Sequence, residues 1–298
     1  MSAGNSHRAS TPKRLPVLVT GCSTGIGRAT AHRLARDSRW QVYASARRLE
    51  SIEALRTDGC ELLELDVTDE ASRVAAVSAI EEAHGSVFGL VNNAGFSQSG
   101  AVESVPLDRV RRQFETNVFG PMELCRLVLP RMRDARRGRI VNVGSMGGRL
   151  TFPGAAWYHA SKYALEALSD ALRFEVAGFG IKVALIEPGI IRTEFSATAA
   201  GELAEISPDD GPYALFDAHV AMTTVSAYET GALARLGGEP GDVARVIEKA
   251  LDSRSPRPRY LVTPSARLLV GLHAVLPDRL WDRMLRSSYP QPGNTLPE

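Results

Sequence analysis

A tyrosine and a lysine stand four residues apart in Tyr158-His159-Ala160-Ser161-Lys162, near the start of a segment with helical periodicity. In a helix this spacing places both side chains on one face, one turn apart. A phenol has a pKa of about 10, which a neighbouring ammonium group lowers by favouring the phenolate. Tyr158 and Lys162 are therefore candidates for an acid–base pair. The pattern also fits two ordinary surface residues, so its meaning depends on the rest of the chain.

A glycine-rich turn follows the first predicted strand. The apolar run 16–20 leads into Gly21-Cys22-Ser23-Thr24-Gly25-Ile26-Gly27, and residues 28–37 have a helical pattern. Glycines allow a close approach of the backbone to a pyrophosphate, and the N-terminus of a helix supplies amide donors. The spacing differs from the G-x-G-x-x-G of many dinucleotide enzymes. A phosphate-binding turn and a plain turn both remain open at this point.

The end of the second predicted strand, 41–45, indicates which cofactor such a site would take. An acidic residue there binds the 2′-hydroxyl of NAD, whereas arginine accommodates the 2′-phosphate of NADP. The chain has Ala46-Arg47-Arg48 and no carboxylate before Glu50. We therefore expect NADP(H) to be preferred over NAD(H), with Arg47 as a contact, unless both arginines are solvated loop charges.

Two further strands end in residues suited to contact a ligand. The third predicted strand, 61–66, closes at Asp66-Val67, where an adenine edge could be met. The fourth, 88–91, is followed by Asn92-Asn93-Ala94-Gly95. Small residues and side-chain amides at the carboxyl end of a strand suit a close ligand approach, although a turn is the simpler interpretation.

Two isolated polar residues are also candidates. Asn117 lies in a long helical stretch, 107–132, which we expect Gly120-Pro121 to interrupt. A polar residue beside a helix irregularity can cap or bend the helix, or serve a site. Ser145 ends the fifth predicted strand, thirteen residues before Tyr158. In isolation, each would be an ordinary loop or helix residue.

Strands and helices alternate along the chain. Helices are predicted over 70–83 and 155–177, and a sixth strand over 181–186. This alternation is typical of an α/β fold with an open parallel sheet and helices on both faces. Every candidate lies at the carboxyl end of a strand or on the helix that follows, which is the edge where such sheets bind ligands.

Composition limits the classes of function. The 298 residues include 44% hydrophobic residues, and 35 Lys and Arg balance 34 Asp and Glu. This balance does not indicate a nucleic-acid partner. Cys22, Cys60 and Cys125 form neither a zinc spacing nor a disulfide framework, so we expect no metal and a reducing, cytoplasmic location. No apolar run approaches the roughly 18 residues that span a bilayer.

Together these motifs resemble the short-chain dehydrogenase/reductase family. The residues that carry the resemblance are Thr20-Gly21-x-x-x-Gly25-x-Gly27, Asn92-Asn93-Ala94-Gly95, Asn117, Ser145, Tyr158-x-x-x-Lys162, and Pro188-Gly189 with Thr193. The resemblance is close over 16–195 and looser over 240–262. It implies a doubly wound Rossmann-like domain over 16–264, with a mostly parallel seven-stranded sheet whose last strand is 259–262, after a helix over 242–252.

The resemblance also implies roles. Tyr158 would be the general acid in carbonyl reduction or the base in alcohol oxidation, and Lys162 would lower its pKa and bind the nicotinamide ribose. Ser145 would bind the substrate oxygen, and Asn117 would hold a water chain that resupplies the proton. The expected cofactor contacts are Gly21, Ser23, Gly25, Ile26, Gly27, Arg47, Asp66, Val67, Asn93, Ala94, Gly95, Tyr158, Lys162, Pro188, Gly189, Ile191 and Thr193.

The substrate is expected to bind beneath a lid over 192–236. Ser145, Gly147, Tyr158 and Phe195 are its predicted contacts, and similarity to steroid- and retinoid-type members favours a bulky lipophilic ketone, aldehyde or alcohol. The apolar lid residues fit ordinary core equally well. Ketoacyl-thioester reductases are the alternative, although they usually end soon after the last strand. A non-catalytic NADP-binding regulatory or scaffold protein is the alternative of another class.

The ends of the chain complete the predicted organisation. Residues 1–15 and 290–298 are predicted to be disordered tails, and 265–289 a helical extension of two amphipathic helices split by Pro277. The extension would pack on the body or across a subunit interface, or dock on a membrane surface. The resemblance implies a homodimer or homotetramer, which the alanine-rich stripe of the helix over 155–177 fits.

Overall fold

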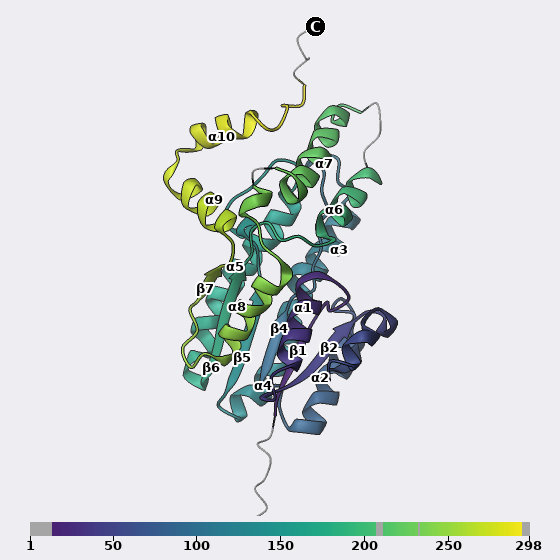
Figure 1. Cartoon of the computed structure of the whole chain (residues 1–298), viewed down its shortest axis with the longest axis vertical. Coiled ribbons are helices and arrows are strands. Elements are labelled where there is room, and N and C mark those ends of the chain that lie inside the picture. Colours follow the sequence, from purple (N-terminus) through teal and green to yellow (C-terminus); the bar gives the residue numbers. More distant parts are fainter. Residues whose placement is uncertain (1–13, 207–210, 232, 294–298) are drawn as a thin grey trace, which may run out of the picture.

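A computed structural model describes residues 14–206, 211–231 and 233–293 (Figure 1). Seven parallel strands form one sheet in the order β3-β2-β1-β4-β5-β6-β7. The strands are β1 (Leu15–Val19), β2 (Trp40–Ala46), β3 (Glu61–Glu64), β4 (Gly89–Asn92), β5 (Gly138–Val143), β6 (Ile181–Glu187) and β7 (Arg259–Leu261). The predicted seven-stranded Rossmann-like sheet is confirmed, with every strand pair parallel.

Helices connect the strands and cover the sheet. They are α1 (Gly25–Ala35), α2 (Glu70–His84), α3 (Leu107–Phe114), α4 (Gly120–Asp134), α5 (Ala156–Val176), α6 (Phe195–Ala204), α7 (Ala214–Glu229), α8 (Pro240–Asp252), α9 (Pro264–Val275) and α10 (Asp278–Arg286). Shorter helical turns include η1 (Leu49–Arg56), η2 (Glu115–Phe119), η3 (Met146–Gly148), η4 (Ala177–Phe179) and η5 (Ala234–Leu236).

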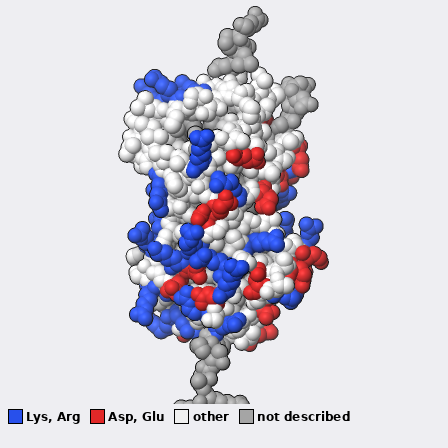
Figure 2. Space-filling view, viewed as in Figure 1, with Lys and Arg blue, Asp and Glu red and all other residues white. Residues whose placement is uncertain are grey.

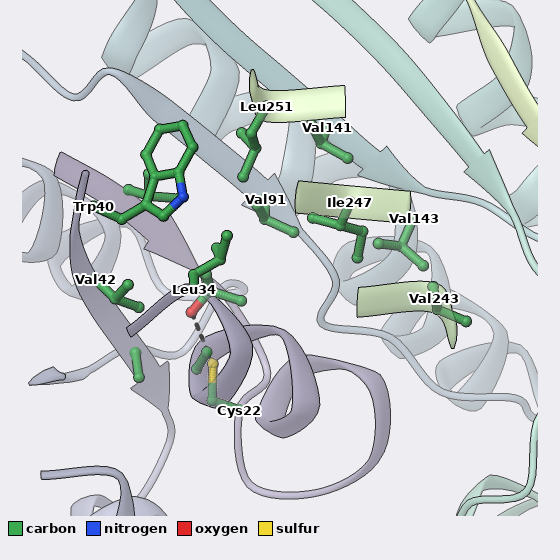
Figure 3. Close-up of a cluster of buried hydrophobic side chains, with 14 of the residues drawn as sticks. Cys22, Leu34, Trp40, Val42, Val91, Val141, Val143, Val243, Ile247 and Leu251 are labelled. Atoms are coloured by element: carbon green, nitrogen blue, oxygen red, sulfur yellow. Dashed lines mark hydrogen bonds between the residues drawn. The ribbon is translucent and has the colours of Figure 1, made fainter. Parts of the chain in front are cut away.

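Two buried layers hold these helices on the sheet. Val17 and Val19 of β1 face the layer that α1 and α8 cover, which is drawn in Figure 3. Leu18 points to the opposite layer, under α2 and α4. Successive strand residues alternate between faces, and here both faces are apolar, as expected of a parallel sheet with helices on both sides.

The helical stretch after β4 differs from the prediction. The predicted break at Gly120-Pro121 is wrong, because α3, η2 and α4 follow one another without a gap from Leu107 to Asp134. The irregularity is the π-helical turn η2, which includes Asn117. Gly120 is needed for packing, since a Cβ there would lie 2.5 Å from the Val67 carbonyl oxygen. Pro121 has no amide hydrogen to donate, and it stands just after the π-helical turn, where the helical hydrogen-bond pattern is already irregular.

The segments beyond β6 lie at the end of the sheet where the strands finish. In Figure 1 the chain enters β1 from below, and α6, α7, α9 and α10 lie at the opposite end of the strands. The predicted lid, 192–236, comprises α6, α7 and η5, with residues 207–210 and 232 outside the described part. Both signs of charge are interspersed over the lower part of the face in Figure 2, whereas the region above is mostly uncharged apart from basic residues near α10.

The predicted helical extension forms as two helices, α9 and α10, separated at Pro277. Their apolar sides pack on the body in a cluster that includes Leu269, Trp281 and Met146. The first strand begins at Leu15, one residue inside the predicted tail. Residues 1–13 of that tail, and residues 294–298 at the other end, lie outside the described residues.

The described residues hold neither a membrane span nor a metal cluster. Among them, no helix is both long and apolar enough to cross a membrane, and no group of three or more His, Cys, Asp or Glu side chains could hold a metal ion. Cys22, Cys60 and Cys125 are buried and unpaired, and burial raises the pKa of each thiol to about 12.

Candidate active site

A cavity of about 680 Å³ lies at the carboxyl ends of the strands. Most of the predicted site residues line its wall. They are Gly21, Ser23, Gly25, Ile26, Arg47, Asp66, Val67, Asn93, Ala94, Gly95, Ser145, Tyr158, Lys162, Pro188, Gly189, Ile191, Thr193 and Phe195. Gly27, Asn117 and Gly147 do not line the cavity; their contacts are with the segments that form its wall.

The glycine-rich turn leaves no room for a side chain at Gly21 or at Gly27. A Cβ on Gly27 would lie 2.1 Å from the Gly21 carbonyl oxygen, and one on Gly21 would lie 2.9 Å from Ala94 Cα. Gly21 also has a φ of +69°, in the left-handed region that favours glycine. The first turn of α1 has no side-chain cap, so its amide groups stay available beside the cavity. Backbone and helix end together form a cradle that suits a phosphate group.

Two side chains fix this turn against the end of β4. Asn93 Nδ2 donates to the carbonyl oxygens of Thr20 and Gly21 over 2.9 and 3.1 Å. Thr20 Oγ1 accepts from the backbone amides of Asn93 and Ala94 over 2.9 and 3.0 Å. The sequence motif indicates no role for the Thr20 hydroxyl group. In the structure this hydroxyl joins the ends of β1 and β4, across 73 residues of sequence.

Three further lining residues, Arg47, Asp66 and Val67, are those expected to meet an adenosine moiety. Arg47 is exposed and directly follows the buried Ala46 at the end of β2. Asp66 Oδ1 accepts from the amide and hydroxyl groups of Thr68, which shapes the turn before α2. Val67 is buried, and its carbonyl oxygen accepts from Arg73.

Tyr158 lies on the first turns of α5 and contacts the lid. Its ring centroid is 5.5 Å from that of Phe195. Burial raises the pKa of Tyr158 to about 12, while a hydrogen bond with Ser145 lowers it. Desolvation of the phenolate outweighs the help of the serine, so the phenol is protonated near neutral pH.

Lys162 is buried one turn further along α5. Its Nζ donates to the Val143 carbonyl oxygen over 2.9 Å and lies 5.8 Å from the centroid of the Tyr158 ring. Burial lowers the pKa of Lys162 to about 8. We expected the Lys162 ammonium to lower the pKa of Tyr158. In the structure the ammonium donates to a backbone carbonyl oxygen instead, and burial is the largest influence on the pKa of both residues.

A histidine supports the turn that carries Ser145. Ser145 Oγ accepts from the Gly147 amide over 3.0 Å, and His159 Nδ1 donates to the Gly147 carbonyl oxygen over 2.9 Å. A Cβ on Gly147 would lie 2.4 Å from that ring nitrogen. Burial lowers the pKa of His159 to about 4, so the ring is neutral near pH 7. Gly147 therefore acts through the shape of the turn.

Asn117 joins three parts of the site. Its Oδ1 accepts from the Phe96 amide over 3.1 Å, and its Nδ2 donates to the Phe96 carbonyl oxygen and to Ser161 Oγ over 2.9 and 3.1 Å. These bonds tie the Gly95-Phe96 segment to α5. The amide is thus occupied by protein groups, and the expected water chain stays a prediction.

The lid contributes residues that the sequence reasoning missed. Tyr228 of α7 lines the cavity, with its ring centroid 6.4 Å from that of Phe195. Burial raises the pKa of Tyr228 above its usual range, and repulsion from Tyr158 adds to this. Glu202 of α6 also lines the cavity and forms ion pairs with Arg109 and Arg112 of α3. In the sequence, an aromatic residue such as Tyr228 in a predicted helix is most simply a core residue, and nothing in the sequence relates Glu202 to Arg109 and Arg112. Only the folded structure of this segment shows these contacts.

The chain is similar to known oxidoreductases over most of its length. The model of the short chain dehydrogenase family matches residues 16–203. The oxidoreductase YusZ of Bacillus subtilis is 34% identical, over 90% of this chain and 96% of that protein. The 3-ketodihydrosphingosine reductase of Bacteroides thetaiotaomicron is 34% identical, over 92% and 97%. A metagenomic short-chain oxidoreductase solved in complex with NADP matches with a TM-score of 0.64 and 25% identity, over 83% of this chain and 96% of that one. The chain therefore belongs to the short-chain dehydrogenase/reductase family of oxidoreductases.

Proposed function

We propose that the protein is an NADP(H)-dependent oxidoreductase that interconverts a ketone or aldehyde with an alcohol, on a bulky lipophilic substrate. The observation that carries the proposal is the convergence of Ser145, Tyr158 and Lys162 on the cavity that the glycine-rich turn also lines. A hydroxyl, a phenol and an ammonium group in one cavity are the groups that carbonyl reduction requires.

Proton transfer is assigned to Tyr158. The phenol is protonated near neutral pH, which is the form that donates a proton to a carbonyl oxygen during reduction, and burial favours this form further. The Ser145 hydroxyl hydrogen-bonds the same substrate oxygen and stabilises the charge that develops there. Lys162, whose pKa is close to physiological pH, takes part in resupplying the proton. The bound nicotinamide supplies or accepts the hydride.

The cofactor preference rests on Arg47. No acidic side chain follows β2 before Glu50, and Arg47 is the charged residue of that segment that lines the cavity. A guanidinium group pairs with a phosphate in a bidentate manner, whereas it gains little from a ribose hydroxyl. Among the related structures one holds NADP and another holds NAD, so the preference rests on Arg47 alone.

The lipophilic substrate rests on the lid. Phe195 and Tyr228 form an aromatic wall beside Tyr158, and Phe96 lines the same cavity. Aromatic side chains of this kind bind extended apolar molecules, while a few polar groups fix their orientation. The similarity to a 3-ketodihydrosphingosine reductase agrees with a long or bulky apolar substrate.

The test is a panel of ketones, aldehydes and alcohols followed by NADPH absorbance. It includes sterols, retinoids, long-chain 3-ketolipids and acyl thioesters, with small polar ketones as the control. We expect turnover of apolar substrates and loss of that turnover in Phe195→Ala. Turnover confined to small polar ketones would refute the lipophilic part. NADPH binding without turnover of any substrate would instead favour a cofactor-binding regulatory protein.

A further inference from the structure

Two glutamates meet in the protein interior behind the catalytic tyrosine. Glu166 follows Lys162 by one turn of α5, and Glu187 is the last residue of β6, directly before Pro188-Gly189. Only 8% of the Glu166 side chain and 1% of the Glu187 side chain are exposed. Both carboxyl groups contact one guanidinium group, that of Arg259. Two carboxylates offer only acceptors, so a hydrogen bond between them requires a proton on one of them.

The surrounding cations do not neutralise both carboxylates. Arg259 Nε lies 3.0 Å from Glu166 Oε2 and 3.5 Å from Glu187 Oε1. The same guanidinium also pairs with Asp170. Arg149 is 3.4 Å from Glu187 Oε1 and is 40% exposed, so its contribution is weakened by solvent.

One oxygen of each glutamate has no other partner. Glu166 Oε1 and Glu187 Oε2 are buried, and within the described part of the chain neither receives a hydrogen bond from an N–H group or from a hydroxyl group. Two such orphan acceptors would be costly if both glutamates were ionised. A proton between the carboxyl groups gives both oxygens a partner and removes one buried charge.

We propose that Glu166 and Glu187 share one proton, and that this pair is a positioning element that holds α5 against the Pro188-Gly189 turn and the Ser145 loop. The loop is included because a Cβ on Gly148 would lie 2.9 Å from Glu166 Cγ, and the Met146 amide donates to the Pro188 carbonyl oxygen over 2.8 Å. Three segments that line the cavity therefore meet at this pair.

The direction of the pH effect follows from the groups around the pair. Burial, the bond to Glu187 and repulsion by it raise the pKa of Glu166 to about 8, and Arg259 opposes this. The other titratable or charged groups around the pair are Asp170, Tyr163 and Arg173 on α5, and Arg149. Because the folded pKa lies above the ordinary value of 4.5, the stabilisation is complete below about 4.5 and is lost as the pH rises through about 8.

The first experiment measures the free energy of unfolding between about pH 5.5 and about pH 9 for the full chain, Glu166→Gln and Asp170→Asn. One proton held only by the folded state changes the folding equilibrium by about tenfold per pH unit up to about pH 8, and the change levels off above that pH. Glutamine can donate to Glu187 without a titrating proton, so Glu166→Gln should lack that decline. Asp170→Asn should keep the decline in stability, because Arg259 and Arg173 lower the pKa of Asp170, so that Asp170 does not titrate in this pH window. An identical decline in the parent and Glu166→Gln would overturn the shared proton.

Infrared spectroscopy gives a second measurement that does not depend on the variants being stable. The parent should show the C=O stretch of a protonated carboxyl group at neutral pH, and this band should disappear as the pH rises above about 8. The band should also be absent from Glu166→Gln. If no carboxylic acid band titrates in this range, the proposal fails.

The positioning role is tested by the pH dependence of NADPH dissociation. Affinity should fall above about pH 8 more steeply in the parent than in Glu166→Gln, by up to about tenfold per pH unit if binding requires the proton. Lys162 also titrates near this pH, but it does so in both proteins, so the difference between them reports on Glu166. Equal slopes would refute the positioning role. Failure of NADPH to bind at all would count against the proposed function, while the unfolding and infrared results would still decide the shared proton.

Discussion

Replacing Gly27 by alanine tests whether the glycine-rich turn is built by close contact or only by flexibility. A Cβ at this position would lie 2.1 Å from the Gly21 carbonyl oxygen, 2.5 Å from Asn93 Nδ2 and 2.8 Å from the Gly21 carbonyl carbon. Carbon atoms in favourable contact are about 3.5–4.0 Å apart, so the methyl group would overlap backbone by more than about 1 Å. The turn must therefore shift away from α1.

Two opposing effects set the size of the change. Alanine in a helix is favoured over glycine by about 1 kcal/mol, whereas overpacking costs about 1–3 kcal/mol or more when backbone has to move. Because two of the three closest atoms belong to backbone, we expect the second effect to win, with a net loss of about 2 kcal/mol. For a chain of this size, that lowers the melting temperature by about 3 °C.

The assay is thermal unfolding of Gly27→Ala with and without NADPH, together with the dissociation constant for NADPH. Affinity should fall by at least about tenfold, because the shifted turn no longer fits a pyrophosphate. Gly271→Ala is the matched control, since Gly271 lies in α9 and a Cβ added there would meet no atom within 4 Å, and it should gain stability and bind NADPH normally. A Gly27→Ala protein as stable as its parent, with unchanged NADPH affinity, would refute the steric argument.

Three further substitutions test the assigned roles. Tyr158→Phe should reduce turnover by at least about a hundredfold with NADPH affinity nearly unchanged, because only the proton donor is lost; retained activity in steady-state kinetics would overturn the mechanism. Lys162→Ala should raise the KM for NADPH and lower kcat, and at saturating NADPH it should reduce the loss of kcat between about pH 7.5 and about pH 9, since the ammonium that deprotonates near pH 8 is gone. Arg47→Asp should weaken NADPH binding by more than about tenfold and leave NADH binding similar in isothermal titration, and an unchanged preference would reject the arginine argument.

The candidate site residues could be predicted because their types and spacing are local features of the sequence. The four-residue spacing of Tyr158 and Lys162 on a helix, and the glycines between a strand and a helix, are short-range features whose geometry follows from backbone periodicity. The seven-stranded parallel sheet followed in the same way from the alternation of apolar strands with amphipathic helices. Each of these inferences uses residues close together in the chain.

The tertiary structure decided whatever depends on burial or on segments far apart in the chain. Burial, and not Lys162, sets the high pKa of Tyr158, because desolvation depends on everything packed around the phenol. Tyr228 meets Phe195 only because α7 folds back over the cavity. Glu166 and Glu187 belong to different elements, and no sequence spacing indicates that both carboxyl groups contact Arg259. Sequence alone thus determined which groups could react, and folding decided their neighbours and therefore their charge.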